Sequence, residues 1–302
     1  MVLVILGVLI IVFIVTRIIP ADPVGAILGG NAPPALIDAM RHQLGLDKPI
    51  LAQLLDYLGG IFRGDFGNSL VSSRPVITDI MEFLPATIEL AFCSIIFAVV
   101  LGVVLGLLSA VYRNRFIDHF ARVFSILGIS HPVFCFDIIL ILIFYYRLGW
   151  LPSGGQYDMF LFPTKTTGLI LLDALIHGEW NIFFNGLKHL ILPTFVLGYS
   201  STASIARIMR ASMLDVLNQN YIRTARAKGL PKKKVILRHA LKNALIPVIT
   251  IIGLEFGGLL SGAVLTETIF SWPGLGRYIV NSLLTLDYPA ITVYQFLKDT
   301  SA

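Results

Sequence analysis

The residues that could do chemistry in this sequence are few, and the most unusual are acids inside long apolar runs. Glu89, Asp137 and Glu255 have mostly apolar neighbours on both sides. An ionisable side chain that enters lipid is costly, so such a residue is a candidate for a solute pathway. Glu89 lies one turn inside its run, where an interfacial position explains it. We predict Asp137 and Glu255 as pathway residues; the alternative for each is a hydrogen bond to a neighbouring helix.

The motifs of enzymes and of nucleotide-binding sites are missing from the sequence. It contains no His-Glu-x-x-His, no Gly-x-Ser-x-Gly and no Gly-x4-Gly-Lys-Ser/Thr. Its histidines are scattered, and Cys93 and Cys135 lie in apolar runs, so no spacing predicts a metal site. We therefore expect no catalytic residue, no metal and no cofactor in this chain.

A strongly basic segment between two apolar runs carries the clearest signal. It contains ten cations and one acid, Asp215. The cations are Arg207, Arg210, Arg223, Arg226, Lys228, Lys232, Lys233, Lys234, Arg238 and Lys242. Lys and Arg of short loops are retained on the cytoplasmic side of a membrane. The segment therefore predicts a cytoplasmic loop rather than a surface for nucleic acid.

Part of this basic segment predicts a short helix. Residues 221–229 have helical character, and Gly229, Leu230 and Pro231 form a stop signal. Small residues occupy one side of the helix and cations the other. Small side chains let a helix sit deep in the groove of a partner protein. The alternative is a basic helix that lies on anionic lipid.

The composition identifies the class of protein that must position these residues. Of 302 residues, 56% are hydrophobic and 14% are charged, whereas soluble domains carry about 25% charged residues. A helix needs about 20 apolar residues to cross the hydrocarbon core of a bilayer. The long apolar runs therefore predict an all-α polytopic membrane protein.

The apolar runs also place the spans. We expect a first transmembrane helix over 1–19, for which a signal peptide is the alternative. A loop with short amphipathic helices near 35–44 and 50–62 should follow over 20–84. The remaining residues, 85–302, form a transmembrane domain. Its spans are expected at about 85–111, 121–146, 187–205 and 244–265, with a partial sixth span at 290–297.

The distribution of charge gives the orientation of these spans. With the amino end inside, the loop that contains Arg113 and Arg115 and the basic segment both face the cytoplasm. The loop 20–84, which has seven acids and four bases, then lies outside. The partial sixth span is too short to cross, so we expect 290–302 to stay at the outer interface.

At the basic segment the sequence resembles the permease subunits of ATP-binding-cassette importers of the dipeptide/oligopeptide/nickel family. The matching stretches are Tyr-Ile-Arg-Thr-Ala-Arg-Ala-Lys-Gly-Leu-Pro at 221–231 and Arg-His-Ala-Leu-Lys-Asn-Ala-Leu-Ile-Pro at 238–247. Further similar pieces stand at 45–49, 64–69, 148–152 and 270–277. Each piece alone is short, but together they cover about 18–289 in the order of the family.

The resemblance implies the type I importer fold with six spans in a bacterial inner membrane. It also implies partners: a second permease subunit, two cytoplasmic ATP-binding-cassette ATPases, a periplasmic solute-binding protein and membrane lipid, but no nucleic acid. The helix at 221–229 would be the coupling helix that docks on an ATPase. Its residues are Tyr221, Thr224, Ala225, Arg226, Ala227, Lys228 and Gly229. Many such permeases carry Glu-Ala-Ala where this chain has Arg-Thr-Ala at 223–225, so that acidic contact is not carried over.

We interpret the chain as the permease subunit of an importer for di- or oligopeptides. Nickel, glutathione or oligosaccharide uptake are the alternatives within the family. A different class of protein, a stand-alone ion-coupled transporter or channel, would use Asp137 and Glu255 as a coupling pair. An intramembrane enzyme is disfavoured because its motifs are missing.

Overall fold

The computed structural model describes residues 33–43, 47–63, 65–130 and 132–301, and the isolated positions 7, 10, 11, 13 and 14. This part of the chain is helical, apart from turns, loops and an isolated β-bridge between Asn68 and Pro75. The chain divides into two compact units, 1–85 with 273–302 and 86–272. The first span, expected over 1–19, lies almost entirely outside the described residues.

The first unit contains α3 (Pro34–Gln43), α4 (Ile50–Phe62), the first residues of α5 (Val76–Val111), α14 (Leu275–Leu284) and α15 (Tyr288–Ser301). Helices α3 and α4 stand where the two short amphipathic helices are expected. Asp287 joins distant parts of this unit. Its carboxylate accepts hydrogen bonds from the Ser69 hydroxyl, at 2.5 Å, and from the backbone N–H of Leu70, at 3.1 Å.

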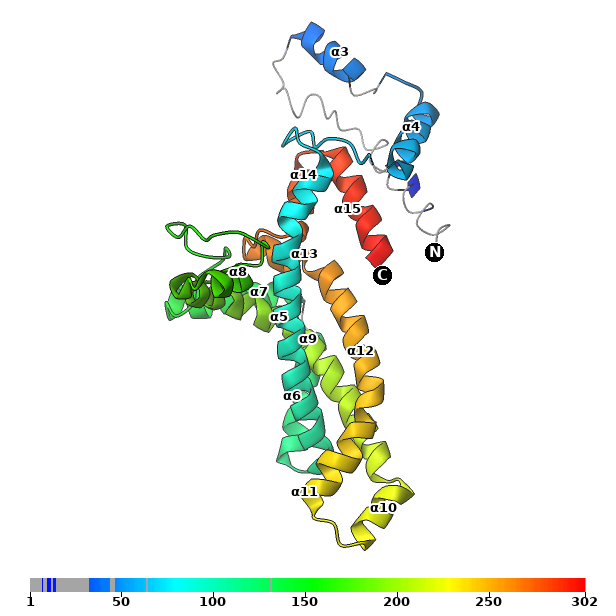
Figure 1. The fold of residues 1–302 in the computed structure, drawn as a ribbon, viewed down its shortest axis with the longest axis vertical. Coiled ribbons are helices and arrows are strands. Elements are labelled where there is room, and N and C mark those ends of the chain that lie inside the picture. Colours follow the sequence, from blue (N-terminus) through cyan, green and yellow to red (C-terminus); the bar gives the residue numbers. More distant parts are fainter. Residues whose placement is uncertain are drawn as a thin grey trace. The chain divides into compact units, whose positions relative to one another are not determined.

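The second unit is built around α9 (Trp180–Leu217), which contacts α6 (Phe116–Ser130), α8 (Ile170–His177) and α12 (Leu241–Gly262). Figure 1 shows α9 and α12 side by side over much of their length. With its 38 residues, α9 is about 57 Å long. It therefore exceeds the expected span 187–205 at both ends.

Two glycines set the distance between α5 and α9. A Cβ atom at Gly102 would stand 2.8 Å from Cγ2 of Ile205, and one at Gly106 would stand 2.6 Å from the carbonyl oxygen of Ala206. Real Cβ atoms do not approach that closely, so the two backbones pack where a larger residue would not fit. By contrast, Gly253 and Gly257 of α12 have open space at the corresponding position.

Three helices of the described part are long and apolar enough to cross a membrane: α5, α9 and the continuous helical run Lys232–Ser261. Where we predict one span at 121–146, the chain instead forms α6 and then α7 (Val133–Leu140), followed by the π-helical segment η1 (Ile141–Arg147). The helix direction bends by 104° between Phe116–Gly128 and Val133–Arg147. Pro132 lies at this break. Proline accounts for the break because it lacks a backbone donor and disfavours a helical conformation of the residue before it.

The expected start of a span at Pro85 also differs from the observed helix. Helix α5 begins at Val76 and contains Pro85 in its interior. Val76 and Ile80 are fully buried, so packing supports the first turns of the helix. The proline removes one hydrogen bond of α5 without ending it.

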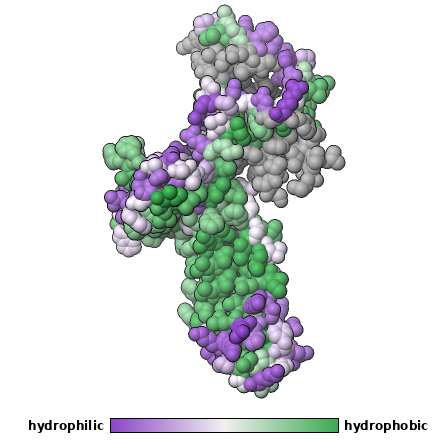
Figure 2. Space-filling view, in the orientation of Figure 1, coloured by the Kyte–Doolittle hydropathy of each residue, from purple (hydrophilic) through white to green (hydrophobic). Residues whose placement is uncertain are grey.

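The surface of the second unit separates by polarity. In Figure 2, hydrophilic side chains gather where α10 and α11 lie, and hydrophobic side chains cover the long helices next to them. Large apolar residues of α5 and α6 are exposed, including Phe92, Val100, Phe120 and Ile126. Such a continuous apolar surface is typical of helices that face lipid.

Candidate functional site

A short helix, α10 (Asn220–Ala227), forms where we expect the coupling helix over 221–229. Two residues, Asn218 and Gln219, connect it to the end of α9. Lys228 and Gly229 follow α10, and Gly229 has a φ of 75°, a left-handed conformation that favours glycine. The chain then enters α11 (Lys232–Lys234), the π-helical segment η2 (Val235–Ala240) and α12. Helix α10 is therefore inserted between two membrane-length helices.

One face of α10 is fixed to the interior of the second unit. Ile222 is fully buried and Ala225 is 8% exposed, and both belong to the hydrophobic cluster that includes Met213 of α9 and Val235 of η2. The spacing of three residues places Ile222 and Ala225 on the same side of the helix. Ala225 therefore packs against other residues of the second unit and helps to anchor α10 to it.

The opposite face of α10 is exposed. Of the residues predicted for the coupling helix, Tyr221, Thr224, Arg226, Ala227, Lys228 and Gly229 are all exposed. Arg223 is exposed as well. The helix thus presents cations together with two small residues, which is a surface suited to an acidic partner.

A side-chain hydrogen bond ties α10 to α12. Asn243 donates from Nδ2 to the Tyr221 hydroxyl, at 3.0 Å, and also to the carbonyl oxygen of His239. Tyr221 therefore links the exposed face of α10 to the first turn of α12.

A buried carboxylate braces the same end of the second unit. Asp118 accepts hydrogen bonds from Nε and Nη2 of Arg210, at 2.8 and 3.0 Å, and from the Ser109 hydroxyl, at 2.6 Å. Its Oδ2, which accepts from Nη2 of Arg210, also accepts from the backbone N–H of Asn114. Asp118 is fully buried, so these bonds hold α5, α6 and α9 together next to the turn at 112–115. The sequence analysis identified this region from Arg113 and Arg115, but it did not identify Asp118.

The three acids from the apolar runs occupy different environments. Glu89 is buried and accepts hydrogen bonds from Nε2 of Gln156 and the N–H of Leu171. These bonds connect α5 to the loop at Gln156 and to the first turn of α8.

The two predicted pathway residues are not paired with each other. Asp137 is fully buried and accepts a hydrogen bond from the Thr266 hydroxyl at 3.2 Å; its Oδ1 has no hydrogen-bond partner among the described residues. Glu255 is half-buried and accepts from the Ser201 hydroxyl at 2.7 Å. Both match the alternative of a bond to a neighbouring helix, and Glu255 is the more accessible of the two.

Glu267 is another fully buried acid, and the sequence analysis did not single it out. The Thr87 hydroxyl donates to it at 2.7 Å. It follows five apolar or small residues, 262–266, a signal similar to the one that picked out Asp137.

The segment before α8 is organised by Asp173. Its carboxylate accepts bonds from the N–H groups of Thr166, Thr167 and Gly168 and from the Thr167 hydroxyl. Burial raises the pKa of Asp173, but these hydrogen bonds outweigh it and hold the pKa below its usual range. A hydrogen bond from Asn185, opposed by burial and helped by His189, likewise lowers the pKa of Asp158 in the same loop.

No group of three or more His, Cys, Asp or Glu residues is placed to hold a metal ion within the described ranges. The free thiols of Cys93 and Cys135 are both half-buried.

Comparisons with known proteins agree over nearly the whole chain. Residues 102–298 match the family model described as binding-protein-dependent transport system inner membrane component, and residues 1–91 match its N-terminal counterpart. A probable D,D-dipeptide transport system permease protein of Escherichia coli (strain K12) is 48% identical over 292 residues, 96% of this chain and 86% of the relative. A di/tripeptide transport system permease protein of Pseudomonas aeruginosa (strain UCBPP-PA14) is 43% identical over 286 residues, 94% of this chain and 85% of the relative.

Proposed function

This chain belongs to the family of binding-protein-dependent transport system inner membrane components, and we propose that it is the permease subunit through which such a system imports small peptides. Its fold is the type I ABC importer membrane fold, and it is a transport subunit of the bacterial inner membrane rather than an enzyme. It works as part of a transporter complex, in which ATP is hydrolysed on other subunits.

Small peptides are the proposed substrate because the names of several relatives share that class. The relatives named above are described as transport permeases for D,D-dipeptides and for di- and tripeptides. A glutathione transport system permease protein is also similar, at 39% identity over 282 residues. We place selection among peptides mainly on a periplasmic solute-binding protein, so the permease itself needs only a pathway of suitable width.

The arrangement of α10 supports its role as the coupling helix. One face, with Ile222 and Ala225, is buried in the hydrophobic cluster shared with α9 and η2, and the other face is exposed and cationic. A partner that pushes on the exposed face would therefore move α9 and α12 as well. We propose that this partner is one of two cytoplasmic ATP-binding-cassette ATPases, and that a second permease subunit completes the pathway.

The competing role for α10 is contact with anionic lipid. The inward position of Ala225 weakens the small-residue argument for docking, since only Ala227 and Gly229 remain as exposed small residues. The bond between Asn243 and Tyr221 favours docking, because it would couple the position of α10 to α12. A helix that only rests on lipid has no need of that connection.

Reconstitution tests the function directly. The chain would be placed in proteoliposomes with its second permease, its ATPases and a binding protein loaded with a radiolabelled dipeptide. We expect dipeptide uptake that requires ATP inside the vesicles. Uptake driven by a proton or sodium gradient without the ATPases would instead identify an ion-coupled transporter.

A further inference from the structure

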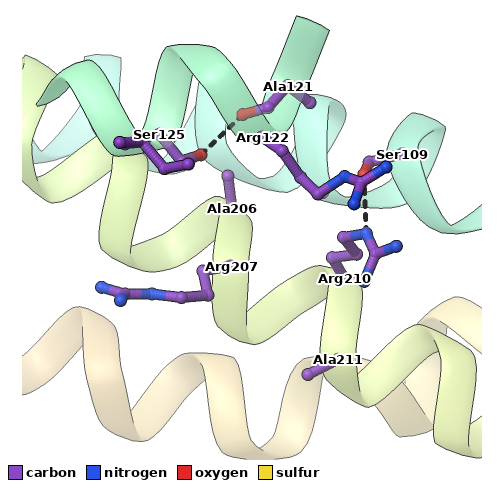
Figure 3. Close-up of a pocket in the computed structure, with 10 residues that line it drawn as sticks. Ser109, Ala121, Arg122, Ser125, Ala206, Arg207, Arg210 and Ala211 are labelled. Atoms are coloured by element: carbon purple, nitrogen blue, oxygen red, sulfur yellow. Dashed lines mark hydrogen bonds between the residues drawn. The ribbon is translucent and has the colours of Figure 1, made fainter. Parts of the chain in front are cut away.

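A cavity of about 320 Å³ lies between α5, α6 and α9 (Figure 3). Its wall is formed largely by small and aliphatic residues: Gly106, Ala121, Ile126, Ala206 and Ala211. The hydroxyls of Ser109 and Ser125 also line it, but both donate to other protein atoms, Asp118 Oδ1 and the Ala121 carbonyl. The volume is at the lower end of the range for ligand pockets, and the wall offers mainly apolar contact.

Three arginines line this cavity, and Asp118 is the carboxylate that pairs with two of them, so positive charge is in excess. Arg210 is committed to Asp118 through two hydrogen bonds. Arg122 lies 3.6 Å from the same carboxylate and keeps 45% of its side chain exposed. Arg207 is exposed, and no ion pair involves it within the described residues. In Figure 3, Arg122 and Arg210 both reach toward Ser109, whereas Arg207 extends away from them.

We propose that this cavity binds an anionic phospholipid from the cytoplasmic leaflet. One acyl chain would lie along the apolar wall, and the phosphate would lie at the mouth on the side of Arg207, which has no ion pair within the described residues, while Arg122 adds to the positive charge around the cavity. The leaflet assignment rests on the orientation in which the basic segment faces the cytoplasm. An apolar wall bordered by excess positive charge is complementary to an amphiphile with an anionic head. A soluble phosphate ester would gain nothing from the wall.

The surroundings of the cavity give lipid a route to it. Val123, Ile126 and Leu127 of α6 are each more than half exposed, at 56%, 63% and 56%. This face of α6 is apolar and fits contact with acyl chains. A lipid molecule can therefore enter from the side, without leaving the bilayer, and place its head at the arginines.

Competition between lipids in the purified complex tests the site. The complex in neutral detergent would be incubated with equimolar phosphatidylglycerol and phosphatidylethanolamine, and the lipids retained would be measured by native mass spectrometry. We expect the wild-type complex to retain phosphatidylglycerol preferentially. In the double variant Arg122→Gln/Arg207→Gln, that preference should fall by about fivefold for each arginine removed.

Two further variants separate the cavity from diffuse charge. Lys233→Gln/Lys234→Gln removes the same charge from the same end of the unit but does not line the cavity, so the preference should persist. Ala211→Phe narrows the cavity without changing charge and should lower retention of phosphatidylglycerol. Equal losses in both double variants, or an unaffected Ala211→Phe complex, would overturn the proposal.

Glycerol phosphate distinguishes the possible sources of the anion. If this soluble ester displaces phosphatidylglycerol at millimolar concentration, the site recognises a free phosphate and the lipid assignment is wrong. A complex that imports dipeptide with ATP but shows no lipid preference overturns this site alone. A complex with the lipid preference but no ATP-driven uptake would instead count against the proposed function.

Discussion

The cations of α10 and the buried carboxylates beside α8 lie in contrasting environments. At the α10 end, Arg223, Arg226 and Lys228 stand exposed on a helix whose other face is buried. At the α8 end, Glu89 and Asp173 are buried, and each accepts at least two hydrogen bonds from its own chain. These two carboxylates next to α8 are therefore satisfied within the chain, whereas the three cations on α10 and its C-terminal turn remain available to a partner.

This difference predicts how each end responds to substitution. Hydrogen bonds to a buried charged group contribute about 1.5–3 kcal/mol each to stability. An exposed cation contributes about 0–1 kcal/mol. Changes at the α8 end should thus lower stability, and changes on the exposed face of α10 should lower binding to a partner.

The largest expected contrast is one of topology. In a background where Cys93 and Cys135 are serine, we expect an impermeant maleimide added to intact cells to label Lys165→Cys and to leave Lys233→Cys unlabelled. Both lysines are exposed in this chain, so access to the membrane side decides the outcome. Asn68→Cys should react like Lys165→Cys. The reverse pattern would invert the orientation, and with it the assignment of α10 to the cytoplasm.

The next contrast compares two glycines that have a left-handed backbone conformation. Gly229 and Gly178 have φ values of 75° and 69°, and no atom lies within 4 Å of a Cβ at either position. Valine at each site should add similar strain, about 1–3 kcal/mol. We expect Gly229→Val to lower ATP-driven uptake tenfold or more while ATP hydrolysis continues, because the turn that closes α10 is displaced.

Gly178→Val, at the C-terminal end of α8, serves as the matched control and should retain most of the uptake. Equal losses in the two variants would mean that strain anywhere in the unit is sufficient, and the special role of the α10 end would be lost.

A smaller effect should separate the two faces of α10. Ile222→Ala removes a fully buried side chain and should lower the free energy of unfolding by about 2–5 kcal/mol. Arg223→Ala removes an exposed side chain and should change it by less than about 0.5 kcal/mol. Arg223→Ala should instead weaken copurification of the ATPase with the permease. A stable Ile222→Ala variant would show that the buried face does not anchor the helix.

The smallest effect concerns Asp173. Asp173→Asn weakens the bonds to the segment before α8 and should lower stability at neutral pH by about 1–3 kcal/mol. Because the folded protein lowers the pKa of Asp173, its contribution is complete above the unfolded pKa of about 3.9. The contribution is lost as pH falls through the folded pKa.

Thermal unfolding of the wild-type and Asp173→Asn complexes from pH 7 to pH 3 measures this difference. The gap between their unfolding temperatures should stay constant down to about pH 4 and narrow below it. A gap that narrows near neutral pH would show that the carboxylate is not stabilised by these bonds.

Local signals in the sequence predicted the α10 region well. The stop formed by Gly229 and Pro231 gave the end of the helix, because backbone conformation at these two residues depends little on distant contacts. The direction in which Ala225 points was not predictable, since an alanine suits a buried face and a docking face equally. That choice depends on how α9 and η2 pack around the helix.

The sequence was less informative about interruptions within long helices. Pro85 suggested the start of a helix, yet packing of Val76 and Ile80 carries α5 through it. Pro132 was included in a continuous span, although the chain breaks there. Hydropathy is insensitive to such breaks because it counts apolar residues and not backbone donors. The separate partners of Asp137 and Glu255 depend on which helices become neighbours, which a single sequence does not reveal.

The close approach of α5 and α9 at Gly102 and Gly106 has a mechanical consequence. A Cβ atom added at either glycine would lie only 2.6–2.8 Å from an atom of α9. The two helices therefore pack too closely to slide past each other. A force that reaches α9 through α10 would also move the part of α5 around Gly102 and Gly106. The two helices would therefore move together rather than slide past each other.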